Sequence, residues 1–371
     1  MRIAYNAILL GNYFSGVEVT ISSLAVMLAR ELGNDFHIFL NNHSRERYSF
    51  PNASCHYAGL PRNSRISRIA WEHFLLPGQV KKHGCDLLHC PGYIAPYKVN
   101  CPTVVTVHDA ITLLRPELCK FSNRLYYRTL MGRSVRQAAQ VIVPSGVVKD
   151  QLVKLFGISP EKINVIPFSP ALVFKKIDDT DLLAQVRIKY GLPEKFVLSV
   201  CNHEPKKNIA GVIRAFAAFK DKVKDYKLVL AGRDAWGTGE TVDIIRQLDL
   251  TGDIIRPGYI PLAVLPAVYS LSDMFLFPSL DEGFGIPVLE AMRCGTPVVC
   301  SDRGALPETT RGAAVCVPPT DIKGIAEALA NFAGNSGMRR DFIEKGFKRT
   351  AELSWEKTTK ATLEVYRKAV E

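Results

Sequence analysis

Short apolar segments alternate with longer segments of helical period along the first half of the chain. The apolar segments are rich in β-branched residues and predict strands at Arg2–Ile8, Phe36–Leu40, Asp86–Cys90, Thr103–His108, Gln140–Pro144 and Ile163–Pro167. Between the first two, residues 19–32 carry apolar side chains at helical spacing. Continuous apolar strands that alternate with helices are typical of a parallel sheet covered on both faces.

The same pattern restarts after a polar linker at Lys175–Asp181. Further strands are predicted at Phe196–Val200, Lys227–Ala231, Ile254–Tyr259, Met274–Pro278, Pro297–Ser301 and Ala314–Val317, with helices such as Ile209–Lys220 and Ile322–Phe332 between them. We therefore predict an α/β protein with two doubly wound, Rossmann-like domains, residues 1–172 and 173–355. Ligands of such sheets bind at the carboxyl ends of the strands, so the cleft between two facing domains is the expected site.

The end of the chain reads as an amphipathic helix over Trp355–Val370. We expect residues 356–371 of this helix to cross back and pack on the first domain.

Composition is that of an ordinary soluble protein, with 47% hydrophobic and 22% charged residues among 371. Its nine cysteines are scattered without a Cys-x-x-Cys pair, which favours a reducing compartment. No apolar run approaches the roughly 20 residues that span a bilayer, and the first residues lack the layout of a signal peptide. We expect a cytoplasmic protein, with peripheral association at the inner face of the membrane as an open question.

Positive charge is concentrated in the first half of the chain. Residues 1–175 hold 20 Lys and Arg against 10 Asp and Glu, whereas residues 176–371 hold 27 against 26. Such a basic half indicates an anionic partner, either a membrane surface or a lipid-phosphate acceptor, unless the charge serves only solubility. Nucleic acid is not expected, because no basic motif with interleaved aromatic residues and no known nucleic-acid module is present.

The segment Asp281–Glu290, Asp-Glu-Gly-Phe-Gly-Ile-Pro-Val-Leu-Glu, is the strongest chemical signal. It follows a predicted strand and opens a helix, with Pro287 in the first turn. The N–H groups of that turn and the helix dipole make an anion site. Glu282 and Glu290 can both face this pocket, where hydroxyls of a sugar or ribose would donate to them. The alternative is a helix whose acidic residues only favour its dipole.

A second signal, Glu204–Asn208, follows the predicted strand at Phe196–Val200 and contains Lys206 and Lys207. A leaving diphosphate gains negative charge as its bond to a sugar breaks. A fixed cation there stabilises the transition state more than the ground state. By itself the segment could equally be an exposed basic turn.

Two weaker signals lie in the first half. His108 and Asp109 lie at the end of a predicted strand, where they could contact a ligand or have a structural role. Ser15-Gly16 lies in the loop after the first strand. A single glycine is little evidence for a phosphate-binding turn.

Arg62, Arg65 and Arg68 are spaced by three residues ahead of Trp71. On a helix or turn they would form a basic edge beside an aromatic side chain. We expect this edge to meet an anionic or membrane-borne acceptor, and a solvated basic face is the alternative.

No metal is predicted. Asp179-Thr180-Asp181 has the Asp-x-Asp form of a metal signature, but it precedes a helical stretch at Leu182–Tyr190. A helix cap formed by Thr180 or Asp181 is the preferred interpretation.

Taken together, these segments resemble glycosyltransferase family 4, over nearly the whole chain. That family has two facing Rossmann-like domains, the GT-B fold, and transfers sugars with retention of configuration. The most specific element is the pair Glu282 and Glu290, and Glu204–Asn208 resembles the family's Glu-Pro-Arg-Lys-Asn segment. A branch with many mannosyltransferases of bacterial polysaccharide assembly shares similar stretches, which are Val107–Asp109, Ser301-Asp302, Leu306–Glu308 and Ser354-Trp355.

The resemblance implies roles for the matching residues. In the second domain, Lys207 would contact the donor diphosphate, Glu290 the ribose hydroxyls and Glu282 the transferred sugar. The backbone at Phe284, Gly285 and Ile286 would line the phosphate and sugar. In the first domain, His108 would contact the sugar and Gly16 would approach the phosphates.

The sequence departs from the family pattern at two places. Many members have an arginine near the position of Cys201, so Lys206 or another base must share the diphosphate charge here. A Gly-Gly pair is common where this chain has Ser15-Gly16-Val17-Glu18.

The predicted activity is a retaining, metal-independent transfer of a hexose from a nucleotide sugar to a saccharide or lipid-linked saccharide, without a cofactor. Branch resemblance favours GDP-mannose as donor, and UDP-sugars stay open. Three alternatives are a nucleotide-sugar epimerase, a sugar phosphorylase and a non-enzymatic protein that binds an anionic ligand or nucleic acid. A dehydrogenase is disfavoured, because no strand precedes a Gly-x-Gly-x-x-Gly segment.

Overall fold

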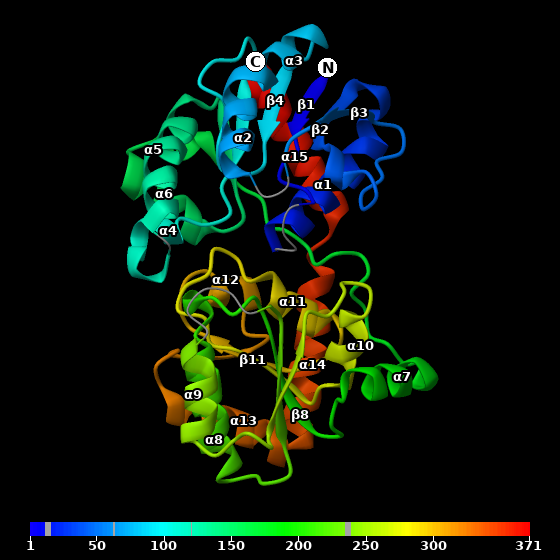
Figure 1. Cartoon of the computed structure of the whole chain (residues 1–371), viewed down its shortest axis with the longest axis vertical. Helices are drawn as coiled ribbons and strands as arrows, with labels where there is room; N and C mark the ends of the chain where they lie inside the picture. Colours follow the sequence, from blue (N-terminus) through cyan, green and yellow to red (C-terminus); the bar gives the residue numbers. More distant parts are fainter. Residues whose placement is uncertain (12–15, 62–63, 120, 234–238) are drawn as a thin grey trace. The chain divides into compact units, whose positions relative to one another are not determined.

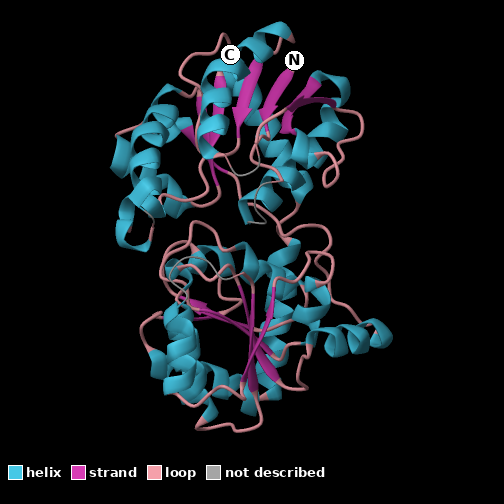
Figure 2. Cartoon of the chain, in the orientation of Figure 1, coloured by secondary structure: helices cyan, strands magenta, loops and turns pink. Residues whose placement is uncertain are grey.

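A computed structural model of the chain describes residues 1–371 except 12–15, 62–63, 120 and 234–238. It divides into two compact units (Figure 1). The first comprises Met1–Phe168 together with Leu353–Glu371, and the second comprises Ser169–Glu352. Each unit has its own parallel sheet flanked by helices (Figure 2), which confirms the predicted α/β class with two Rossmann-like sheets.

The first unit contains a seven-stranded sheet in the order β3-β2-β1-β4-β5-β6-β7, with every neighbouring pair parallel. Its strands are β1 (Ile3–Asn6), β2 (Phe36–Asn41), β3 (Ser54–Ala58), β4 (Leu87–Cys90), β5 (Thr103–Thr106), β6 (Gln140–Val143) and β7 (Ile163–Val165). The side chains of β1, β4 and β5 are buried throughout, as expected for strands covered on both faces.

Strand β3 was not predicted from the sequence. It lies at the edge of the sheet beside β2, and all its residues but Ala58 are only half buried. Polar Ser54 and His56 interrupt any apolar run, so the pattern that marks the central strands is absent here. A further difference concerns β5, which ends at Thr106, so His108 lies in the following loop.

Helices and short helical turns connect these strands. The helices are α1 (Gly16–Leu32), α2 (Arg65–Ala70), α3 (Leu76–Lys82), α4 (Ile111–Leu114), α5 (Phe121–Gln137), α6 (Gly146–Phe156) and α15 (Trp355–Val370). The turns are η1 (Gly33–Asp35), η2 (Asn42–Ser44), η3 (Trp71–Leu75), η4 (Pro116–Leu118) and η5 (Pro160–Lys162).

The C-terminal helix α15 belongs to the first unit, although the whole second unit precedes it in the sequence. It packs on α1 and on the strands β4, β5 and β6. The hydroxyl of Tyr366 lies 2.7 Å from His89 Nδ1 on β4, and Thr358 donates to the carbonyl of Pro167 at 2.8 Å. The chain end thereby closes the core of the first unit.

The second unit contains a six-stranded parallel sheet in the order β10-β9-β8-β11-β12-β13. Its strands are β8 (Phe196–Val200), β9 (Lys227–Ala231), β10 (Ile254–Gly258), β11 (Met274–Phe277), β12 (Val298–Ser301) and β13 (Val315–Val317). The helical elements are α7 (Thr180–Tyr190), η6 (Pro205–Lys207), α8 (Ile209–Lys220), α9 (Gly239–Gln247), α10 (Leu265–Leu271), α11 (Ile286–Arg293), α12 (Leu306–Thr310), α13 (Ile322–Gly334) and α14 (Ser336–Ala351).

The Asp-x-Asp segment caps helix α7, but through a different residue from the one expected. Asp179 Oδ1 accepts hydrogen bonds from the backbone N–H groups of Asp181 and Leu182, at 3.1 and 3.0 Å. The expectation that Thr180 or Asp181 forms the cap was therefore wrong, because both already lie in the first turn. Among the helices that the structure describes, none has the length and apolar character to cross a bilayer.

Candidate active site

Polar side chains of the second unit converge at the carboxyl ends of β8 and β11, two neighbouring strands in the middle of the sheet. From β8 the chain continues to β9 on one side, and from β11 it continues to β12 on the other. Ligands of open α/β sheets bind where the strand order reverses in this way. Residues 204–208 follow β8 and residues 281–290 follow β11, so the two segments marked by the sequence meet at this point.

Lys207 and Glu282 form a buried ion pair across the two strand ends. Lys207 Nζ lies 2.5 Å from Glu282 Oε1, and the two side chains are only 14% and 10% exposed. Ser279 Oγ donates to the same carboxylate oxygen at 2.7 Å. The ammonium group also lies 4.9 Å from the centroid of the Phe277 ring. Charges so shielded from water act more strongly on a bound ligand than exposed ones do.

The carboxyl group of Glu282 is held in its ionised form. Burial alone raises its pKa, but the charges of Lys207 and Lys206 and hydrogen bonds from Lys207 and Ser279 outweigh burial. The resulting pKa lies below the ordinary value for a glutamate. The site therefore presents a carboxylate that only accepts hydrogen bonds beside ammonium groups that only donate them.

The turn that carries the two lysines is hydrogen-bonded to the loops that follow β11 and β13. Asn208 has a left-handed backbone with φ of 57°, and its Nδ2 donates to the carbonyls of Pro278 and Pro319, both at 3.0 Å. The N–H of Leu280 donates to the carbonyl of Lys206 at 2.8 Å. These bonds fix the lysine turn relative to the loop that carries Glu282.

Two glycines allow the loops around Glu282 to approach one another closely. Gly285 precedes α11 with φ of +90°, and a Cβ there would lie 2.3 Å from Leu306 Cδ2. A Cβ on Gly304, whose φ is +60°, would lie 2.4 Å from the carbonyl oxygen of Glu282. Since Gly285 has no side chain to cap α11, the N–H groups at this helix start remain suited to an anion.

Glu290 lies on α11, and its environment differs from that of Glu282. It is 8% exposed, and the Tyr269 hydroxyl donates to its Oε2 at 3.1 Å. Burial raises the pKa of Glu290 to about 7, although the hydrogen bond from Tyr269 lowers it somewhat. Near neutral pH this carboxyl group is divided between its protonated and ionised forms.

Cys201 occupies the position where the family resemblance led us to expect arginine. Burial raises the pKa of its thiol to about 12, and the nearby charges of Lys207 and Glu282 act on it in opposite directions. A neutral thiol therefore stands beside the ion pair. A Cβ on Gly232 would lie 1.7 Å from the Cys201 carbonyl oxygen, so the two strand ends are also in close backbone contact.

Sequence reasoning did not single out Ser279 or Tyr269 as site residues. Tyr269 lies on α10, 21 positions before Glu290, and no spacing in the sequence connects the two. The only feature of the sequence that could have marked Ser279 as a site residue was its position directly after a predicted strand. Asn208 stood in a segment that we had marked, but its role in fastening the turn was visible only in three dimensions.

In the first unit, His108 is buried in the loop after β5. Its Nε2 donates to the carbonyl of Pro91 at 2.8 Å, and its ring lies 5.3 Å from Tyr93 and 5.5 Å from Phe168. Burial lowers the pKa of His108, although the Pro91 carbonyl and the Asp109 charge partly oppose that shift. A neutral ring that donates through Nε2 keeps Nδ1 as a hydrogen-bond acceptor.

Asp109 and Gly16 are two further predicted site residues of this unit, and their contacts leave their predicted roles untested. Asp109 Oδ1 accepts from the N–H of Ile111 at 3.2 Å, at the start of α4. Gly16 begins α1, and no atom of the described residues would lie within 4 Å of a Cβ there. Ser15, its partner in the marked loop, lies outside the described residues.

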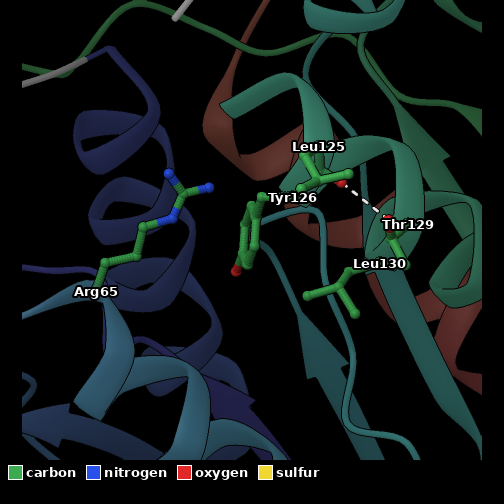
Figure 3. A pocket seen from close by; sticks show the side chains of 5 residues that line it. All are labelled: Arg65, Leu125, Tyr126, Thr129 and Leu130. Atoms are coloured by element: carbon green, nitrogen blue, oxygen red, sulfur yellow. Dashed lines mark hydrogen bonds between the residues drawn. The ribbon is translucent and has the colours of Figure 1, made fainter. Parts of the chain in front are cut away.

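The two described arginines of the predicted basic edge both act on Tyr126 but differ in their other contacts. Arg65 lies over the ring of Tyr126, 4.0 Å from its centroid, beside a surface pocket of about 420 Å³ (Figure 3). Arg68 instead lies 3.4 Å from Glu72, a buried carboxylate that also accepts from Asn6 Nδ2 at 3.0 Å. Arg62 lies outside the described residues, so an acceptor-binding edge stays a prediction.

Two family models match the chain, one in each unit. The model described as Glycosyltransferase Family 4 matches residues 14–168, and the model described as Glycosyl transferases group 1 matches residues 185–349. Among relatives, O-antigen chain mannosyltransferase B of Escherichia coli is 27% identical over 76% of this chain and 74% of its own. O-antigen chain mannosyltransferase RfbU of Salmonella typhimurium is 29% identical over 73% of this chain and 72% of its own.

Solved structures share the fold over almost the full length. HepE of Anabaena, crystallised with UDP and glucose, superposes with a TM-score of 0.75 at 17% identity and covers 99% of both chains. Sucrose-phosphate synthase of Thermosynechococcus elongatus gives a TM-score of 0.78 at 20% identity over 99% of this chain and 98% of its own. With both sheets of the GT-B fold and a family model matched in each unit, this chain is a glycosyltransferase that belongs to glycosyltransferase family 4.

Proposed function

We propose that the chain transfers a hexose, with mannose favoured, from a nucleotide diphosphate sugar to a saccharide or lipid-linked saccharide in the synthesis of a cell-surface polysaccharide. The names of the O-antigen mannosyltransferase relatives support mannose as the transferred sugar. GDP-mannose as the donor rests on the family resemblance of the sequence. UDP in the HepE structure keeps UDP-sugars as the second donor class. The observation that carries this proposal is the buried Lys207–Glu282 pair at the carboxyl ends of β8 and β11.

In this proposal the two lysines and the start of α11 bind the donor diphosphate. Negative charge grows on the diphosphate as its bond to the sugar lengthens. The ammonium of Lys207, already fixed by its partners, then stabilises the transition state more than the ground state. Lys206 supplies the second cation, because Cys201, at the position where many family members have arginine, carries no positive charge in any protonation state. The backbone at Phe284, Gly285 and Ile286 lines the phosphate and the sugar.

The two carboxyl groups bind hydroxyls on either side of the diphosphate. Glu282, ionised by its lysine neighbours, accepts hydrogen bonds from the transferred sugar. Glu290, with a pKa of about 7, either accepts from or donates to the ribose hydroxyls of the nucleotide. A donor with a deoxyribose nucleotide is therefore expected to bind more weakly.

The proposed reaction retains the configuration of the donor sugar. The bond between the anomeric carbon and the phosphate oxygen breaks, and the acceptor oxygen bonds to the same face of that carbon. The departing phosphate oxygen takes the proton of the acceptor hydroxyl, so no protein nucleophile is needed. The anomeric configuration of the product, read by NMR, tests this assignment, and an inverted product contradicts it.

We propose that the reaction proceeds without a metal ion. Asp179 and Asp181, the pair with the form of a metal signature, are used at the start of α7, where Asp179 caps the helix. The expected result is an initial rate unchanged by EDTA. Complete loss of the rate with EDTA and its recovery with Mn²⁺ would contradict metal independence.

The first unit is proposed to bind the acceptor and the far side of the sugar. His108 offers a neutral imidazole for hydroxyl contacts, Asp109 lies in the loop before α4, and Gly16 is the first residue of α1 in the same unit. These assignments rest on the family resemblance together with the local geometry of each residue.

A lipid-linked acceptor fits the exposed surface of α2, η3 and α5. Ile66, Phe74, Leu75 and Leu125 are 83, 78, 58 and 61% exposed. Apolar side chains exposed together with arginines are typical of surfaces that dock on anionic lipid. We expect the chain to sediment with vesicles containing phosphatidylglycerol, and less so at high salt.

A matched pair of variants tests this surface. Ile66→Ser should weaken sedimentation with the vesicles, whereas Ile188→Ser should not, because Ile188 is equally exposed at 82% but lies on α7 in the second unit. Equal binding by both variants and the unchanged chain would remove α2 from the membrane role.

The central test is Lys207→Ala with Lys195→Ala as its control. Losing one group that stabilises a developing oxyanion typically lowers turnover by about 10²–10³-fold. We expect that loss in kcat for Lys207→Ala, measured as nucleotide diphosphate released at saturating donor in the presence of acceptor. Lys195 pairs with Asp225 at the opposite, amino end of β8, and its removal should leave kcat unchanged.

Near-normal turnover of a folded Lys207→Ala protein would remove this lysine from the reaction. Folding is checked by circular dichroism before kinetics, because the substitution also leaves Glu282 buried without its cation.

A further inference from the structure

Three histidines meet on the first unit, at the edge of its sheet away from any residue assigned to glycosyl transfer. His37 lies on β2 and His56 on the neighbouring strand β3, while His83 directly follows α3. In the sheet register His37 pairs with Ser54 and Phe39 with His56. Since His37 and His56 are thus offset by two residues, their side chains point to the same face.

The ring nitrogens lie close enough together to reach one metal ion. His37 Nδ1 and His56 Nε2 are 3.0 Å apart, and one nitrogen from each of the three rings lies within 4.8 Å of the others. Zinc bonds to imidazole of about 2.0–2.1 Å at tetrahedral angles place nitrogen ligands roughly 3.3 Å apart. Small side-chain rotations therefore suffice to bring all three nitrogens to one ion.

Their surroundings keep the three rings neutral, which is the form that binds a metal. Burial, together with the nearby His83, His37 and Lys82, lowers the pKa of His56 to about 4. The pKa values of His37 and His83 are lowered in the same way, by burial first and by neighbouring charges second. At neutral pH each ring therefore keeps a lone pair on one nitrogen.

The contact between His37 and His56 is compatible with metal binding. One of these neutral rings donates its N–H to the other. To free both lone pairs, the donating ring needs only to carry its proton on the other nitrogen. Binding would then require a change of tautomer and no net release of protons.

The charges near the cluster are mixed. Arg2 and Lys82 act on the histidines as cations, and Asp35 acts on His37 as an anion. Asp35 Oδ1 lies 3.7 Å from Arg2 Nε and partly offsets that cation. The rings are half buried, which leaves room for water as a fourth ligand.

We propose that His37, His56 and His83 bind one divalent transition-metal ion, with zinc as the expected species, at a site separate from the donor site. Imidazole nitrogens are suitable ligands for Zn²⁺ and for copper, iron and nickel ions, whereas Mg²⁺ and Ca²⁺ prefer oxygen ligands. The bound ion joins the edge strand β3 and the end of α3 to β2. It stabilises the folded first unit, because a ligand that binds only the folded chain raises its stability.

The test is calorimetric titration of Zn²⁺ alone into the full chain, prepared without a histidine tag and freed of metal. One ion per chain should bind to the unchanged protein and raise its unfolding temperature. Loss of an outer-shell partner typically costs about 10–100-fold in metal affinity, so removal of the direct ligand in His56→Gln should weaken binding by roughly 100-fold or more.

His43→Gln is the matched control, because His43 lies just after β2 in the same unit but outside the cluster. It should bind Zn²⁺ as the unchanged chain does. His83→Gln, at a helix end, serves as a second ligand variant should His56→Gln fail to fold. Co²⁺ should give the visible absorption of a low-coordinate site in the unchanged chain and in His43→Gln only. Absence of Zn²⁺ binding by the unchanged chain, or equal binding by the folded ligand variants, would overturn the proposal.

Discussion

At the scale of single residues, the candidate site holds two buried glutamates whose ionisation is driven in opposite directions. Lys207 and Lys206 keep the pKa of Glu282 below its ordinary value, whereas no cation among the described residues offsets the burial of Glu290, whose pKa rises to about 7. Neighbouring carboxyls with separated pKa values can perform different tasks at one pH. We assign the charged one to the transferred sugar and the partly protonated one to the ribose.

Glu290→Gln should change how stability depends on pH. The pKa of Glu290 is about 7 when folded and near 4.5 when unfolded, so the folded chain holds an additional proton between these values. The contribution of this group to stability is therefore complete below pH 4.5 and is lost as the pH rises to about 7. A shift of this size corresponds to roughly 3 kcal/mol.

We compare the free energy of unfolding of Glu290→Gln with that of the unchanged chain. Between pH 4.5 and pH 8 this difference should change by about 3 kcal/mol in favour of the variant. Urea unfolding at a series of pH values measures it. Glu327→Gln, which alters an exposed carboxyl on α13, is the control. A difference that stays constant with pH would contradict the ionisation assigned to Glu290.

At the scale of elements, the start of α11 depends on backbone that only glycine adopts easily. Gly285 combines a left-handed φ with close packing against Leu306, and Gly304 allows the next loop to contact the carbonyl of Glu282. The helix start, the Glu282 loop and the turn before α12 are therefore one packed unit. A change at Gly285 should reach the ligand site as well as the fold.

Gly285→Ala is expected to destabilise the protein and to weaken nucleotide binding. A strained backbone conformation typically costs about 1–3 kcal/mol, and here the contact of 2.3 Å with Leu306 adds to it. Urea unfolding and the Kd for a nucleoside diphosphate measure the two effects.

Gly191→Ala is the control that separates the cost of a left-handed backbone from the cost of a steric clash. Gly191 ends α7 in the same unit with φ of +60°, and among the described residues no atom would lie within 4 Å of its Cβ. It should lose only about 1 kcal/mol through strain and keep its nucleotide affinity. Equal losses for the two variants would show that packing at Gly285 contributes nothing.

At the scale of the whole molecule, the last helix of the chain completes the first unit rather than the second. Trp355 at its start is 1% exposed and its ring lies 6.3 Å from that of Phe168. Tyr366 bonds to His89 in the middle of the first sheet. The first unit is therefore complete only once residues 353–371 have packed onto it.

Trp355→Ala should destabilise the first unit by about 3–5 kcal/mol, as is typical for a large aromatic removed from a core. Hydrogen exchange resolved along the chain should show lost protection in β4, β5 and β6 and little change in β8 and β11. Val370→Ala, at the 43% exposed end of the same helix, is the control. Comparable loss of protection in both sheets would contradict an effect confined to the first unit.

Much of the fold was predictable because central strands of parallel sheets are buried on both faces and therefore appear as unbroken apolar runs. Strands β8 and β9, and helices α8 and α15, were predicted to the residue. Strand β3 was missed because an edge strand with half-buried polar residues has no such run. The cap of α7 was assigned to Thr180 or Asp181 in place of Asp179, since Asp179 and Asp181 are chemically equivalent until the helix start is known.

The sequence by itself determined the α/β class, the family and the segments that carry Lys207, Glu282 and Glu290, because apolar periodicity and local motifs are properties of neighbouring residues. Only the tertiary structure decided that Ser279 and Lys207 share one oxygen of Glu282, that Tyr269 supports Glu290, and that three histidines from β2, β3 and the residue after α3 meet. Apart from the bond between Ser279 and Glu282, these contacts join positions far apart in the chain. The packing of the sheets sets their distances and burial, and burial with charge then sets their pKa values.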